Sequence, residues 1–105
     1  MTNPLLLLLL LCALPLRLWA AEILVISSYH PEYLWDRSYS ASLEAHLGDH
    51  HRLSYFYMDT KRRSPDDFDH IAEQALAYYR QSKPDLVILG DDNAINYLAR
   101  DIAAL

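Results

Sequence analysis

The chain has 105 residues, of which 52% are hydrophobic, and its 9 basic and 14 acidic side chains give a formal net charge of −5. This length predicts one small domain, and the acidic balance argues against nucleic acid as a partner, because a nucleic-acid surface needs a basic stripe. The 2 glycines are too few for a Walker loop or a G-x-G-x-x-G turn, so nucleotide sites of those two kinds are excluded.

The N-terminal segment predicts a signal peptide over residues 1–21. An apolar run extends from Leu5 to Leu16 and is shorter than the roughly 20 residues that a membrane-spanning helix needs. The small residues Ala20 and Ala21 suit cleavage at this point, whereas the lack of Lys or Arg before Leu5 leaves an uncleaved membrane anchor as the alternative. We therefore expect a periplasmic or other extracytoplasmic location.

The single cysteine lies inside this predicted leader. Cys12 follows Leu11 rather than a small residue, so we interpret it as apolar filler and not as a lipid-attachment site. Residues 22–105 contain no cysteine, which excludes disulfides, thiolate zinc sites and cysteine nucleophiles there.

The first predicted strand and helix follow the leader. Glu22 to Ser28 is a β-branched apolar run with a polar end, which predicts a buried strand. A helix is predicted next, because apolar side chains recur every four residues at Tyr39, Leu43 and Leu47. This helix is expected to begin near Trp35 or Asp36 and to end at Gly48 in a left-handed conformation.

The second strand and helix are predicted from a partial alternation and a helix-start pattern. His51 to Met58 predicts a strand with one less buried face. Ser64 is expected to cap the second helix, with Pro65 at its first position and Asp67 in its first turn. Its apolar stripe continues to about Gln81 and consists of Phe68, Ile71, Ala72, Ala75, Leu76 and Tyr79.

The third strand and helix complete the pattern. Leu86 to Leu89 predicts a strand that Gly90 ends, and the segment 91–93 offers N-cap residues for a helix. The inward side chains of that helix are expected to be Ala94, Ile95, Leu98 and Ile102. The order βαβαβα predicts an α/β fold in three layers, with a parallel sheet of strand order 2-1-3.

The third strand also bears on the completeness of the sheet. Four consecutive apolar residues suit a strand that is covered on both faces and paired on both edges, yet the order 2-1-3 places Leu86 to Leu89 at the rim. We therefore expect residues 22–105 to be the N-terminal part of a larger, here incomplete, α/β lobe.

Polar segments follow each predicted strand, where ligands of open parallel sheets bind. Free N–H groups at the helix starts add donors for a small anionic or polar ligand. The side chains that we expect to contact a ligand are Ser28, Tyr29, Trp35, Asp59, Asp91 and Asp92.

Each of these residues has a structural alternative. Ser28 suits the backbone groups at a strand end, Tyr29 suits packing, and Trp35 suits covering the core. Asp92 or Asn93 suits a helix cap, which leaves Asp91 for a loop bond or a ligand.

The basic segment 61–63 has three alternatives: a solvated loop, pairing with Asp66 and Asp67, or attraction of an acidic ligand. No metal and no cofactor is predicted. His46 and His50 have helical spacing, but Gly48 separates them and no H-E-x-x-H pattern is present.

Three motifs in order resemble one family. They are Ser28-Tyr29-His30-Pro31 with Trp35, then Tyr57-Met58-Asp59-Thr60-Lys61-Arg62, then Asp85-Leu86-Val87-Ile88 followed by Asp91-Asp92-Asn93-Ala94. They are similar to periplasmic substrate-binding proteins of ABC-type transport systems and to related domains fused outside the membrane to sensor histidine kinases. The resemblance covers essentially residues 22–105. It implies a type I periplasmic-binding-protein-like fold, in which two α/β lobes close on a ligand, and the chain matches the beginning of the first lobe.

The sequence thus favours an exported, non-enzymatic module that recognises a small-molecule ligand, as the substrate-binding component of an ABC-type transporter with a membrane permease as partner. The alternative is the extracytoplasmic sensory domain of a membrane histidine kinase. A third hypothesis is a small secreted hydrolase that uses Ser28 and His30, although their segment lacks the G-x-S-x-G elbow of such enzymes.

Overall fold

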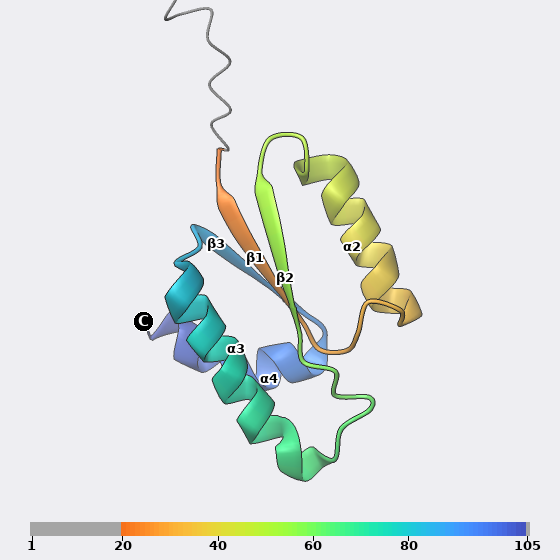
Figure 1. Cartoon of the computed structure of the whole chain (residues 1–105), viewed down its shortest axis with the longest axis vertical. Helices are drawn as coiled ribbons and strands as arrows, with labels where there is room; N and C mark the ends of the chain where they lie inside the picture. Colours follow the sequence, from red (N-terminus) through yellow and green to blue (C-terminus); the bar gives the residue numbers. More distant parts are fainter. Residues whose placement is uncertain (1–19, 105) are drawn as a thin grey trace, which may run out of the picture.

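Figure 1 shows the computed structural model, which describes residues 20–104. In chain order the elements are β1 (Glu22–Ser27), α2 (Leu34–Leu47), β2 (Arg52–Tyr57), the 3₁₀ turn η1 (Pro65–Asp67), α3 (Phe68–Ser82), β3 (Leu86–Gly90) and α4 (Asp92–Ala103). The predicted order of strands and helices is confirmed. The signal peptide predicted over residues 1–21, with Cys12 in it, lies almost wholly outside the described residues.

The strands form a parallel sheet in the predicted order, β2-β1-β3. Ile23 of β1 lies opposite Leu53 of β2 on one side and Leu86 of β3 on the other. Figure 1 shows α2 on one side of the sheet and α3 and α4 on the other, so the three-layer arrangement is confirmed. The carboxyl ends of all three strands meet at the lower end of this view.

The main core lies between the sheet and the pair α3–α4. Side chains alternate along a strand, so every second residue of β1 faces these helices. The buried members of this core are Leu24, Ile26, Met58, Ile71, Ala72, Ala75, Leu76, Ala94 and Leu98. Burial of each Leu or Ile side chain stabilises the fold by about 1.5–3 kcal/mol.

The other face of the sheet packs against α2 through mixed contacts. The Tyr39 hydroxyl donates to Ser27 Oγ, and the Tyr55 hydroxyl donates to Glu44 Oε1 at 2.7 Å. Leu43 and Leu47, on the predicted apolar stripe, are half-buried. This second layer is therefore more polar than the main core.

Two local predictions were wrong. Gly48 is right-handed (φ −65°) because the helical turn continues there, its N–H donating to the Glu44 carbonyl. Ile95 was expected on the inner face of α4 but is 50% exposed. A helix turns about 100° per residue, so Ile95 points away from Ala94 and Leu98, whose predicted inward positions are confirmed.

The cap of the second predicted helix is confirmed, since Ser64 Oγ accepts the Asp66 N–H at 3.4 Å. The first turn is a 3₁₀ turn, and α3 proper begins at Phe68. At its other end α3 closes on Lys83, which is left-handed (φ 47°).

β3 lies at the rim of the sheet, as predicted. Within residues 20–104 it pairs with β1 alone, and Leu86 is 52% exposed. That the chain is part of a larger lobe stays a prediction. In the part of the chain that the structure describes, no helix is long and apolar enough to cross a membrane.

Candidate functional site

The loops that follow the three strands are tied together by backbone hydrogen bonds. The Ser28 N–H donates to the Gly90 carbonyl at 3.0 Å, and the Thr60 N–H donates to the Ser28 carbonyl at 3.0 Å. The Asp59 N–H donates to the Tyr29 carbonyl at 2.8 Å. The polar segments expected to converge at the carboxyl edge of the sheet therefore do so, and we call this surface the carboxyl edge.

Ser28 is the centre of this network and is fully buried. Its hydroxyl donates to the Gly90 carbonyl at 2.6 Å and accepts the Ala94 N–H at 2.8 Å, so both functions of the hydroxyl are used by the backbone. Its carbonyl also accepts the Thr60 hydroxyl at 2.7 Å, and Thr60 Oγ1 accepts the amide of Asn93 at 2.9 Å. Ser28 thus has the structural role that was the alternative to ligand contact: it joins the start of α4 to the sheet.

Tyr29 is buried (4% exposed) and links two carboxylates. Its backbone N–H donates to Asp36 Oδ2 at 3.1 Å, and its hydroxyl donates to Asp92 Oδ1 at 2.8 Å. Burial, followed by the bond to Asp92, raises the pKa of the Tyr29 hydroxyl. The same bond is the main cause that lowers the pKa of Asp92, which stays ionised in neutral solution.

Asp91 caps α4; the sequence offered the segment 91–93 for this role and favoured Asp92 or Asn93 within it. Its Oδ1 accepts the Asp92 N–H at 2.8 Å, while its backbone has φ 73° and ψ −176°. Glycine alone adopts this region readily, and other residues there cost about 1–3 kcal/mol. The cap therefore lies within the predicted segment, one residue before the two favoured positions.

Asp59 is also left-handed, with φ 59°. Its Oδ1 accepts Arg62 Nε at 2.7 Å, and its carboxylate is partly exposed. Arg63 pairs with Asp67 at 2.7 Å, one of the alternatives proposed for the basic segment. Among the described residues Lys61 forms no ion pair. Its Nζ lies over the rings of Tyr29 and Tyr33.

The aromatic side chains beside the carboxyl edge are in mutual contact. The ring of Tyr33 meets that of Tyr29 edge-on at 4.9 Å and that of Trp35 at 5.8 Å, measured between centroids. Lys61 Nζ lies 4.9 Å from the Tyr29 centroid and 5.4 Å from the Tyr33 centroid. Trp35 is 59% exposed, so it does not cover the core and is accessible to a ligand.

Asp36 and Tyr39 belong to the site but were missed in the sequence. Asp36 is fully buried, and its Oδ1 has no hydrogen-bond partner among the described residues. Burial raises the pKa of this carboxyl. Both residues lie in α2, where the pattern indicated only a helix start and an apolar face, and no local signal distinguishes a buried carboxylate in a first turn from an exposed one.

Tyr39 packs against Gly90. A Cβ on Gly90 would lie 2.8 Å from Tyr39 Cζ, so only glycine leaves room for this ring. Burial raises the pKa of Tyr39 to about 12. The close approach holds the first turns of α2 against the end of β3.

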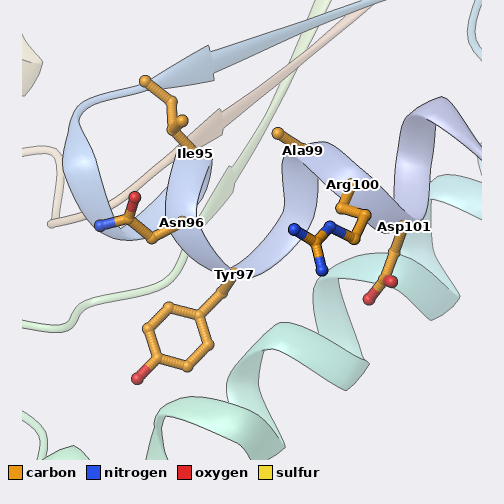
Figure 2. Close-up of a pocket in the computed structure, with 6 residues that line it drawn as sticks. All are labelled: Ile95, Asn96, Tyr97, Ala99, Arg100 and Asp101. Carbon is orange, nitrogen blue, oxygen red and sulfur yellow. The ribbon is translucent and has the colours of Figure 1, made fainter.

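A hollow of about 500 Å³ lies elsewhere, on the outer surface of α4. Figure 2 shows that its lining side chains all project from this one helix; they are Ile95, Asn96, Tyr97, Ala99, Arg100 and Asp101. A ligand pocket needs opposing walls that bury most of the ligand. The carboxyl edge, which joins three loops, is the better candidate despite this hollow.

Among residues 20–104, no group of three or more His, Cys, Asp or Glu side chains could hold a metal ion. His46 Nδ1 lies 2.7 Å from the Ser42 carbonyl in its own helix.

Comparison of the chain with family models, with curated proteins and with solved structures finds no match. The resemblance to periplasmic substrate-binding proteins therefore stays an expectation from the sequence motifs.

Proposed function

We propose that the chain is an exported ligand-recognition module of the ABC substrate-binding type, and that the carboxyl edge is one wall of its ligand site. The observation that carries the proposal is the strained backbone of Asp91 at this edge. Glycine would relieve that strain and cost only a few tenths of a kcal/mol as a cap, so we infer that the Asp91 carboxylate serves a purpose beyond capping. Export is supported by the predicted leader.

Recognition fits the edge better than hydrolysis does. A nucleophilic serine needs a base within hydrogen-bond reach of its hydroxyl. The Ser28 hydroxyl donates to the Gly90 carbonyl, and no bond joins Ser28 to His30 within residues 20–104. The hydrolase hypothesis is therefore left without an activated nucleophile.

The exposed side of the edge sets the expected affinity. Ligand pockets bury about 70–90% of a small ligand, and one wall that includes the exposed Trp35 buries much less. We expect dissociation constants of about 1 mM, which corresponds to roughly 4 kcal/mol of binding free energy.

Trp35 provides the test. The full chain carrying Trp19→Phe retains Trp35 as its one tryptophan, and its fluorescence can be titrated with amino acids, sugars, nucleosides and oxyanions to about 20 mM, well above the expected constant. A saturable change that Asp91→Gly weakens and the exposed-site control Asp101→Asn leaves unchanged supports the proposal. If no compound in the panel produces saturable changes in Trp35 emission or in the amide NMR signals of the edge, the proposal is wrong.

A further inference from the structure

We infer that the ligand of the carboxyl edge carries an organic cation, a primary ammonium or a guanidinium, and that this cation takes the place now held by the Lys61 ammonium. The inference rests on the proposed function and names the chemical class of its ligand. Three independent features of the edge support it: an aromatic pair that already holds a cation, an excess of carboxylates, and a buried oxygen without a donor.

The aromatic pair consists of Tyr29 and Tyr33. Their rings meet edge-on, and Lys61 Nζ lies within 5.4 Å of both centroids. This is the range in which a ring face attracts a cation. Lys61 itself is exposed and sits on a flexible stem, so a ligand cation can displace it at little cost in packing.

The carboxylates near this pair outnumber its cations. Arg62 is engaged by Asp59, and Arg63 by Asp67. Two further carboxylates accept hydrogen bonds from Tyr29: Asp92 Oδ1 from its hydroxyl at 2.8 Å and Asp36 Oδ2 from its backbone N–H at 3.1 Å. Among residues 20–104 neither of these carboxylates forms an ion pair, so an anionic ligand at the Tyr29 ring would meet repulsion from both.

The buried oxygen is Asp36 Oδ1. The other oxygen of Asp36 accepts the Tyr29 N–H, so this carboxylate lies against the same residue whose ring holds the cation. The nearby Tyr39 hydroxyl has one proton and donates it to Ser27. Buried carboxylate oxygens are rarely left without a donor, and a cation bound at the Tyr29 ring would compensate the charge of this enclosed carboxylate at a distance.

Three compounds that each contain one benzene ring and differ in charge test the inference: the cation benzylammonium, the neutral benzyl alcohol and the anion benzoate. Each is titrated into the full chain carrying Trp19→Phe, with Trp35 emission and isothermal calorimetry as readouts at low ionic strength, because salt screens exposed charges. We expect benzylammonium to bind about tenfold more tightly than benzyl alcohol, within the range of a cation–π contact assisted by carboxylates, and benzoate to bind more weakly than both.

The variants separate competition by Lys61 from a general charge effect. Lys61→Met removes the resident ammonium and keeps the stem, so benzylammonium should bind several-fold more tightly, whereas the control Lys83→Met at the far end of α3 leaves its affinity unchanged. Asp92→Asn and Asp36→Asn should each weaken benzylammonium about tenfold and leave benzyl alcohol unchanged. Circular dichroism and amide NMR spectra establish that each variant is folded.

The outcomes distinguish the inference from the proposed function. If benzoate or benzyl alcohol binds at the edge as tightly as benzylammonium, or if Lys61→Met leaves benzylammonium binding unchanged, the cation inference is wrong and the recognition function stands. If none of the three compounds and no compound of the wider panel binds saturably, both are wrong.

Discussion

Replacement of Gly90 by alanine is expected to destabilise the fold, although alanine is compatible with the backbone there. Among the described residues no glycine has a positive φ, so Gly90→Ala introduces no backbone strain. The new Cβ would instead lie 2.8 Å from Cζ and 3.3 Å from Cε2 of Tyr39. The ring cannot retreat freely, because its hydroxyl donates to Ser27.

The size of the effect follows from three contributions. Overpacking costs about 1–3 kcal/mol, and loss of the Tyr39–Ser27 hydrogen bond costs about 0.5–1.5 kcal/mol. The lower entropy of the unfolded chain offsets about 0.4–1 kcal/mol. We therefore expect Gly90→Ala to lower the free energy of unfolding by about 2 kcal/mol, a large fraction of the roughly 4–12 kcal/mol expected for a domain of this size.

Urea denaturation measures this loss. With a slope of about 1 kcal/mol per molar, the midpoint should fall by about 2 M while the slope stays constant. Tyr39→Leu removes the atoms that crowd the new methyl group, which are the hydroxyl oxygen, Cζ and Cε2, and serves as the second arm of a double-mutant cycle. The double variant should be no less stable than Tyr39→Leu alone, with a coupling energy of about 2 kcal/mol.

Two results would refute the reasoning. An unchanged or raised urea midpoint for Gly90→Ala would show that Tyr39 does not hold α2 against β3. Additive losses in the double variant would show that the methyl group acts on something other than the Tyr39 ring.

Three further predictions concern the carboxyl edge. Asp91→Gly should raise the free energy of unfolding by about 1 kcal/mol, since the relief of strain exceeds the small loss of the cap. Asp91→Ala, which loses the cap and keeps the strain, should lower the free energy of unfolding by about 1 kcal/mol. A glycine variant that is destabilised in urea titrations would show that the Asp91 backbone is not strained. Tyr29→Phe should raise the pKa of Asp92 toward its ordinary value of 3.8, because it removes the hydrogen bond that is the main cause of the lowering. A carboxyl with a lowered pKa stabilises the fold above that pKa, and this stability is lost as the pH falls through it. The variant should therefore lose less stability than the unmodified chain below about pH 4. The pKa of Asp36 is raised from 3.8, so this residue stabilises the fold most in its neutral form, and its contribution to stability falls as the pH rises through the raised pKa. Asp36→Asn should remove this loss of stability. Urea midpoints that change in parallel for the variant and the unmodified chain across pH 3–7 would contradict the prediction.

The sequence by itself determined the order and type of the elements and the topology of the sheet. Apolar runs, the four-residue recurrence of Tyr39, Leu43 and Leu47, and the Ser64 cap are patterns among near neighbours in the chain. Such patterns depend on the local backbone, and parallel connections then leave few topologies. The position of β3 at the rim followed from the same argument.

The sequence also indicated which segments meet at the carboxyl edge, but not what each side chain does there. Ser28 was expected to contact a ligand, yet both functions of its hydroxyl are used by backbone groups more than sixty residues away along the chain, at Gly90 and Ala94. Asp91 rather than Asp92 or Asn93 caps α4, because its backbone adopts a positive φ that no residue pattern indicates.

Tertiary structure alone decided the burial of Asp36, the contact of Tyr39 with Gly90 and the place of Lys61 over two rings. A carboxylate in the first turn of an isolated helix is exposed to water. Asp36 is buried because the loop after β1 packs over it. These features depend on groups that are distant in the chain and are brought together only when the sheet assembles, so no local pattern contains them.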